Sequence, residues 1–210
     1  MKYEVIRSLA QWHGLRGQWN TLLADSRADQ LFMTWEWLDC WLRVQRSVTD
    51  LRIICVRGTG GELLGVAPFY VANYRLLDIL PYRMLRMIGD VDSGAEYQTW
   101  LARTSDEDRV CEVIVRAMRA LRSEWDLLWI PNLESWSGAH EPMVRALRAG
   151  RLGIRSRPRD FSTVALPADY QAFLASMSTN RRQQIRRNTK KILSKPGVEV
   201  RKVTTRDELG

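Results

Sequence analysis

The sequence predicts a mixed α/β fold in which helices flank a central β-sheet. Apolar residues make up 45% and charged residues 27% of the 210 residues, which is typical of a globular chain with a real core. Segments with apolar residues at helical spacing alternate with short β-branched runs. Nine tryptophans add large aromatic surfaces that must be buried or used. Together these observations exclude a disordered, collagen-like or disulfide-stapled chain.

Hydrophobic periodicity places the individual elements. Helices are predicted at residues 15–25, from Thr34 with Glu36 in its first turn, from Ser105 to about residue 121, and at residues 141–149, 169–177 and 179–193. Strands are predicted at residues 2–7, 51–57, 62–72, 84–88, 97–101, 125–130, 154–159, 162–166 and 198–203. Pro68 interrupts one of these runs, which indicates an edge position or a bulge.

The element order divides the chain into three parts. Residues 1–167 form a mixed α/β domain, and residues 168–196 form a helical linker that contains a basic helix. Residues 197–210 begin a new unit with a strand and the capping box Thr205-x-x-Glu208. That capping box opens a helix for which no further residues follow, so we expect this last unit to be truncated.

Composition and cysteine usage predict a cytoplasmic protein. The longest run without a charge or a break, residues 63–74, is shorter than the ~20 residues of a membrane helix. The N-terminus has no signal-peptide pattern. The three cysteines form no CxxC pair, which favours reduced core thiols over a disulfide framework or a zinc site.

Two histidines are the available neutral-pH bases, His13 and His140, and neither lies in a known catalytic motif. Catalytic residues therefore stay unassigned. The loop at residues 90–94 resembles a calcium loop but lacks the further ligands and the closing Glu of an EF-hand, so no metal is expected. The tryptophans at positions 35, 37 and 41 are a candidate sugar-stacking platform. Trp37 and Trp41 share a helical face that favours packing instead, whereas Trp35 points elsewhere and is the better candidate for an exposed contact with substrate.

Four stretches of the chain, in this order, resemble GNAT-type acyltransferases. They are Leu31-Phe32-Met33-Thr34-Trp35-Glu36-Trp37-Leu38, residues 61–70 with Leu64-Gly65-Val66-Ala67-Pro68, the loop at residues 89–97, and Leu166-Pro167 followed by Tyr170 and the basic helix. The chain looks like the N-terminal half of bacterial acetyltransferases of the cellulose- and exopolysaccharide-associated group. That group is related to the Fem-type peptidyltransferases.

The resemblance implies two GNAT-like domains, with the acyl-CoA site in the second. The whole protein would use acetyl-CoA or another acyl-CoA to acylate an amine, in polysaccharide or cell-envelope biosynthesis. The acceptor would be a small molecule, a sugar or a peptide. Residues 1–167 would then form one wall of an inter-domain acceptor cleft, with Asp92, Glu96 and Tyr97 as candidate substrate contacts. A solvated turn is the alternative for that loop.

One stretch departs from the family pattern. A CoA-binding GNAT domain places a glycine-rich turn before its third helix, where backbone N–H groups hold the pyrophosphate. The corresponding residues here, 102–108, contain no glycine and three acidic residues, which would repel a pyrophosphate. We therefore expect acyl-CoA to bind the full-length protein but not residues 1–210 alone.

The basic helix carries nearly all of the net charge of +8. Residues 180–195 hold seven basic residues and no acidic one, which leaves residues 1–179 at +1. Candidate anion-binding residues in this helix are Arg181, Arg182, Arg186, Arg187 and Lys190. The helix can be a solvated face that pairs with the second domain, or it can contact an anionic substrate or CoA phosphate. The near-neutral body argues against nucleic acid. The alternative function is a non-catalytic module that docks an anionic partner or nucleic acid.

Overall fold

The structure is a computed structural model that divides into two compact units, Met1–Ser156 and Arg157–Gly210. It describes residues 1–209 except 29, 46, 47, 49, 91–93, 132, 134, 159, 161, 163 and 206. The first unit contains the whole β-sheet. The domain boundaries expected near residues 167 and 196 stay predictions. No helix in the described part of the chain is long and apolar enough to cross a membrane.

A six-stranded mixed sheet forms the centre of Met1–Ser156, which confirms the predicted fold class. Its strands are β1 (Lys2–Ile6), β2 (Leu51–Arg57), β3 (Leu63–Leu76), β4 (Leu80–Met87), β5 (Leu101–Ala102) and β6 (Leu127–Trp129). The order is β1-β2-β3-β4-β6, and β5 pairs with β3. Neighbours are antiparallel except β4 and β6, which are parallel and are joined by a long crossover connection that includes α4.

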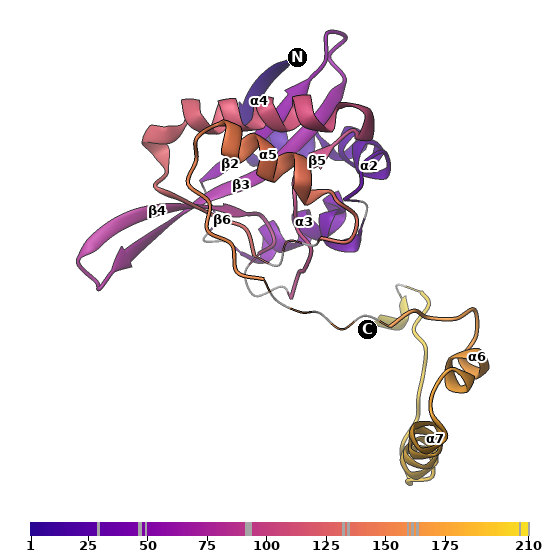
Figure 1. Ribbon diagram of the computed structural model, residues 1–210. Helices are drawn as coiled ribbons and strands as arrows, with labels where there is room; N and C mark the ends of the chain where they lie inside the picture. The colour runs from indigo at the N-terminus through magenta and orange to yellow at the C-terminus, as the bar shows by residue number, and fades with distance from the viewer. Residues whose placement is uncertain are drawn as a thin grey trace. The chain divides into compact units, whose positions relative to one another are not determined.

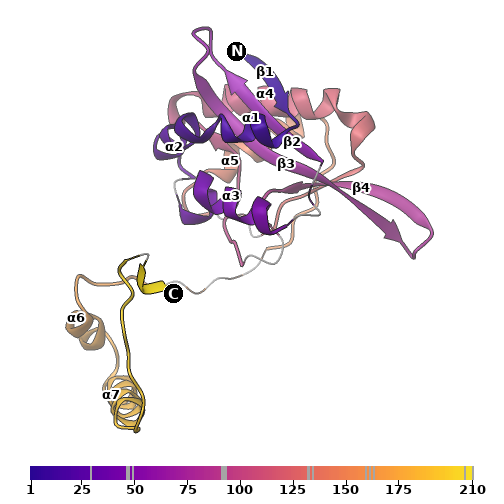
Figure 2. The ribbon, with the colours of Figure 1, turned by 180° about the vertical axis from the view of Figure 1, so that it is seen from behind.

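Helices cover both faces of this sheet (Figures 1 and 2). On one face lie α1 (Leu9–His13), α2 (Arg16–Ala24) and α3 (Trp35–Val44), and on the other lie α4 (Glu107–Ala120) and α5 (His140–Ala149). Single turns of 3-10 helix occur at Leu31–Met33, Thr104–Asp106, Arg122–Glu124 and Asp207–Leu209. The second unit contains α6 (Tyr170–Ala175) and α7 (Thr179–Leu193). As predicted, Thr34 caps α3, and its hydroxyl accepts a hydrogen bond from Trp37 N.

Buried tryptophans form much of the core. Trp12 and Trp19 are fully buried and lie edge to face, with ring centroids 5.2 Å apart. Their indole N–H groups donate to Asp39 Oδ1 at 2.9 Å and to Met33 O at 2.8 Å. Burial of an indole is tolerated because its one donor is satisfied. The high tryptophan content therefore serves packing in this part of the core.

Strand β3 changes partner along one side, and Pro68 lies at the change. β2 pairs with one side of β3 from Leu63 to Tyr70, whereas the other side pairs with β5 at Gly65–Val66 and with β4 from Phe69 onward. The Pro68 carbonyl accepts from Ile88 N at 2.8 Å, so the position of its missing N–H faces this gap. The prediction of an edge or a bulge at Pro68 is wrong, because the gap removes the need for an N–H donor.

Several predicted elements differ from the structure. The described residues within 154–159, 162–166 and 198–203 form no strand, and the strand predicted at 97–101 is reduced to β5. Helix α1 is an additional element.

Cys55 and Cys111 are buried, and burial raises the pKa of each thiol to about 12. Cys40 is exposed, which corrects the expectation of three core thiols.

We expect Gly89→Ala to destabilise the protein more than Gly61→Ala. Both glycines have a left-handed φ, +92° and +86°. A Cβ at Gly89 would lie 2.8 Å from Gln98 Nε2 and 2.9 Å from Leu38 Cδ2, whereas a Cβ at Gly61 would meet no atom within 4 Å. Gly61→Ala should cost about 1–2 kcal/mol from backbone strain, and Gly89→Ala about 1–3 kcal/mol more from overpacking. Urea unfolding measures both, and equal losses would contradict the packing around Gly89.

Candidate functional site

A long loop leaves the sheet at the gap beside Pro68. The chain departs after Ile88 and returns at Leu101, which pairs with Val66, only two residues along β3 from Pro68. The loop at residues 89–100 therefore leaves from the middle of the sheet rather than from its edge. Three of the stretches that resemble GNAT acyltransferases meet on this loop. Gly89 packs against Leu38, and Tyr70 Oη donates to Asp90 Oδ1 at 3.1 Å.

Asp90 anchors the start of the loop. Its side chain is fully buried and accepts a hydrogen bond from Arg86 Nε at 2.7 Å. Burial raises the pKa of Asp90, and the hydrogen bond from the Arg86 guanidinium opposes that rise. Arg86 also hydrogen bonds to the Tyr74 hydroxyl. This buried charge pair fixes the loop and is not exposed to a ligand.

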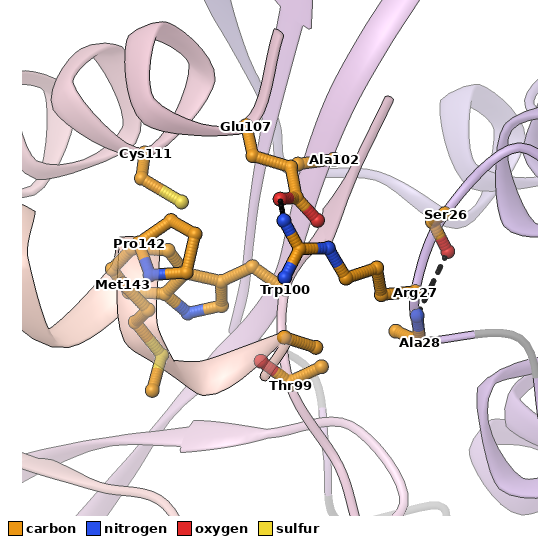
Figure 3. A pocket seen from close by; sticks show the side chains of 11 residues that line it. Ser26, Arg27, Ala28, Thr99, Trp100, Ala102, Glu107, Cys111, Pro142 and Met143 are labelled. Atoms are coloured by element: carbon orange, nitrogen blue, oxygen red, sulfur yellow. Dashed lines mark hydrogen bonds and ion pairs between the residues drawn. The ribbon is translucent and has the colours of Figure 1, made fainter. Parts of the chain in front are cut away.

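The far end of the loop lies against the N-terminus of α4 (Figure 3). Thr99 and Trp100 line a cavity of about 10 Å³. Residues 26–28 and the start of α5, with Pro142 and Met143, also line it. That volume is enough for about one water molecule. Among the described residues, Thr99 Oγ1, Trp100 Nε1, Gln98 Oε1 and His140 Nδ1 are buried without a hydrogen-bond partner. Of these residues, Thr99 and Trp100 line the cavity, which is too small for a substrate.

Arginines neutralise the acidic start of α4. Arg27 Nη2 lies 2.7 Å from Glu107 Oε2, and the Glu107 side chain is only 9% exposed (Figure 3). Burial raises the pKa of Glu107, while the Arg27 charge opposes the rise. Arg145 pairs with Asp108 at 2.8 Å. The carboxylates of the chain itself therefore lie at the helix end where a pyrophosphate would bind.

Glu96 and Tyr97 lie on the outer part of the loop and are partly exposed. Tyr97 has a φ of +62°, which is strained for a bulky side chain. Gln30 Nε2 donates to the Tyr97 carbonyl at 3.1 Å and holds this conformation. A hydrogen bond with the Glu96 carboxylate raises the pKa of the Tyr97 hydroxyl. The structure thus brings two of the predicted substrate contacts together.

Trp136 completes this group, although no sequence pattern singled it out as a site residue. Its ring centroid lies 4.5 Å from that of Tyr97, with the rings at 75°, and the residue is 61% exposed. The signal that could have found Trp136 is a tryptophan in a polar stretch without hydrophobic periodicity, Ser135-Trp136-Ser137-Gly138. Such a residue has no core face to join and favours a surface role.

The other predicted site residues lie elsewhere or outside the described residues. Trp35 is 6% exposed and stacks on Trp12, so the expectation of an exposed Trp35 is wrong. Its place in the core follows from α1, whose tryptophan supplies the stacking partner. Asp92 lies outside the described residues. His13 Nε2 lies 3.3 Å from Asp39 Oδ1, and His140 is the first residue of α5.

The predicted anion-binding residues all lie on α7 in the second unit. Helix α7 has no buried residue in the structure, and its N-cap Ser178 accepts a hydrogen bond from Arg181 N. Among the residues that the structure describes, none of its cations forms an ion pair with a carboxylate. The predicted cationic residues are Arg181, Arg182, Arg186, Arg187 and Lys190.

Comparisons with known proteins place few constraints on this chain. No protein-family model matches it, and no curated protein matches it. A tetramutant of the BH1408 protein from Bacillus halodurans is 5% identical with a TM-score of 0.46, and covers 78% of this chain and 100% of its own. A second mutant of that protein is 7% identical with a TM-score of 0.45, and the match covers 79% of this chain and 100% of the mutant's chain. A probable acetyltransferase is 15% identical with a TM-score of 0.38, and the match covers 80% of this chain and 99% of the acetyltransferase chain. These likenesses are too distant to assign a function.

We expect Arg27→Met to destabilise the protein by about 1–3 kcal/mol at neutral pH, because it leaves the Glu107 carboxylate buried without a partner. Loss of Arg27 should raise the pKa of Glu107 further above its ordinary value of 4.5. The folded state then binds a proton more readily than the unfolded state, so stability is regained as the pH falls toward that value.

Urea unfolding at about pH 5 and pH 7 measures this effect. The loss caused by Arg27→Met should be smaller at the lower pH. The double variant Arg27→Met/Glu107→Gln is the control, because it has no carboxylate to titrate and should lose the pH difference. An equal loss for Arg27→Met at both pH values would contradict the role of the ion pair.

Proposed function

We propose that this chain is the N-terminal part of a GNAT-superfamily N-acyltransferase, in which Met1–Ser156 supplies one wall of the acceptor cleft. The resemblance implies that the acyl-CoA site lies in a second domain. The observation that carries the proposal is the meeting of the motif stretches around the loop at residues 89–100. Leu38 lies against Gly89 and Tyr70 hydrogen bonds to Asp90, so two separate parts of the sequence meet the start of the loop.

The chemistry of this unit suits acceptor binding rather than acyl-CoA binding. Acyl-CoA carries phosphates, and the one helix end that matches the family's pyrophosphate position holds Glu107 and Asp108. The loop instead presents Glu96 and Tyr97 partly at the surface, where the exposed Trp136 from the segment before α5 joins them. An acidic and aromatic surface suits an amine-bearing acceptor, including a sugar or peptide of the cell envelope.

Acetyl-CoA should not raise the melting temperature of residues 1–210, because the start of α4 is already occupied by carboxylates. Thermal unfolding with increasing acetyl-CoA measures this, since a ligand that binds only the folded state stabilises it by mass action. The protein extended through the second domain should instead be stabilised and should transfer an acyl group to an amine. A concentration-dependent rise for residues 1–210, or no transfer by the extended protein, would contradict the proposal.

A second candidate function is a non-catalytic module that docks an anionic partner through α7. The exposure of this helix and its lack of acidic residues favour that alternative. Under the acyltransferase proposal, residues 1–210 should bind duplex DNA only weakly and without sequence preference, on the order of 10⁻⁵ M at physiological salt. Sub-micromolar, sequence-selective binding would favour the alternative.

The salt dependence of binding tests which residues contact a polyanion. Each phosphate that the protein neutralises adds about −0.9 to the log–log slope of affinity against salt. If α7 docks nucleic acid, Arg182→Gln/Arg186→Gln/Lys190→Gln should flatten the slope by about one unit for each phosphate that is no longer neutralised. The control, Arg116→Gln/Arg119→Gln on the exposed face of α4, should leave it unchanged. Under the acyltransferase proposal the α7 variant changes acyl transfer by the extended protein instead.

A further inference from the structure

We infer that Glu96, Tyr97 and Trp136 form a binding site for a primary ammonium group. The inference deepens the proposed function, on which it rests for identifying that ammonium as the acyl acceptor. Three features of this surface support the site. They are a carboxylate without a protein cation, an aromatic corner and a strained backbone that holds both in place.

Glu96 differs from the other carboxylates near the site in its charge balance. Glu107 pairs with Arg27, Asp108 with Arg145, and Asp90 with Arg86. Within the described residues, no lysine or arginine forms an ion pair with Glu96, whose side chain instead meets the neutral hydroxyl of Tyr97. A carboxylate without a protein cation attracts a cation from outside.

The two aromatic rings form a corner beside that carboxylate. Tyr97 and Trp136 meet edge to face at 75°, so their ring faces stand as adjacent walls. Trp136 is 61% exposed, which leaves its ring surface open to a ligand. A cation over the face of tryptophan or tyrosine is attracted by the ring quadrupole, and tryptophan is the best of the aromatic residues for this contact.

The backbone holds the corner in place before a ligand arrives. Tyr97 keeps a left-handed φ of +62°, a conformation that bulky residues adopt only when their surroundings enforce it. Gln30 supplies that constraint through its hydrogen bond to the Tyr97 carbonyl, and the neighbouring Gln98 is buried and bonded to the Ile88 carbonyl at 2.8 Å. In this conformation the Tyr97 ring lies against the Trp136 ring, with the centroids 4.5 Å apart.

The combination selects an ammonium over an anion or a neutral ring. A phosphate would be repelled by Glu96, and a neutral ring would gain stacking but leave the carboxylate without a cation. A primary ammonium satisfies both, because its N–H groups donate to Glu96 while its charge lies against the ring faces. The carbon skeleton next to the nitrogen packs on Trp136.

The experiment compares two ligands with the same ring, cyclohexylammonium and cyclohexanol, by NMR of the tryptophan indole N–H groups in residues 1–210. We expect cyclohexylammonium to shift the Trp136 signal in the millimolar range and cyclohexanol to shift it at least fivefold more weakly. Added salt should weaken the ammonium response, since the Glu96 carboxylate is partly exposed to solvent. Equal responses to the two ligands, or no response to either, would overturn the inference, and neither result depends on a variant.

Variants assign the response to the three residues. Glu96→Gln should weaken cyclohexylammonium binding on the order of tenfold, and Trp136→Ala should weaken it on the order of fivefold, as read from the remaining signals. Tyr97→Phe keeps the ring and frees the carboxylate, so it should retain binding. The matched control is Trp129→Ala, which removes another half-exposed tryptophan on β6 and should have no effect. Unchanged binding in Glu96→Gln would overturn the site.

The outcome also separates this site from the proposed function. Binding of cyclohexylammonium by residues 1–210, combined with no acyl transfer by the extended protein, would leave the ammonium site standing and refute the acyltransferase proposal. Acyl transfer that is unaffected by Glu96→Gln and Trp136→Ala would refute the assignment of the ammonium to the acyl acceptor.

Discussion

The change of partner along β3 is the constraint on which the rest of the first unit depends. Because β4 ends at Met87 and β5 starts at Leu101, one side of β3 carries two strands with a gap at Pro68. A proline fits this position because no backbone donor is needed there. The gap lets the chain leave the sheet after Ile88 and return at Leu101, which pairs with Val66, two residues from Pro68 along β3. It thereby sets a polar and aromatic loop on a buried, rigid base.

Carboxylates at the buried base of the loop are paired with arginines, whereas the carboxylate on its surface has no such partner among the described residues. Buried carboxylates are tolerated only with partners, and Asp90 and Glu107 each have an arginine. The partly exposed Glu124 is also paired: its hydrogen bond to Arg7 lowers its pKa to about 2, and Arg52 is a second partner. These pairs are structural. Glu96, at the exposed end of the loop, meets a neutral hydroxyl rather than a cation, so its charge is available to a ligand.

Local patterns in the sequence predicted the elements that carry their own signal. Helices α2, α3, α4, α5 and α7 and the hairpin of β2 and β3 have clear periodicity or caps, and the structure contains them. A strand was predicted at residues 154–159, but its described residues, 154–158, are in no strand, because a local pattern cannot supply the partner strand that pairing requires. The burial of Trp35 was missed because it depends on Trp12 of α1, a helix too short to show a period.

The candidate site was predictable only where its residues are neighbours in the sequence. Glu96 and Tyr97 lie in a loop that the resemblance marked, whereas Trp136 lies about forty residues away and joins them only through tertiary structure.

The distribution of charge gives the two units complementary roles in the proposed reaction. Acyl transfer from CoA brings together a polyanionic donor and an amine acceptor. The first unit offers a carboxylate and two aromatic rings but has neutralised the helix end where phosphates would bind. The second unit holds seven basic residues between positions 180 and 195 without an acidic one. On the proposed function, recognition of the amine belongs to the loop at residues 89–100, and attraction of the donor phosphates belongs to α7 and the second domain. The near-neutral first unit is then expected, because a strongly cationic surface around Glu96 would repel the ammonium that the loop is built to receive.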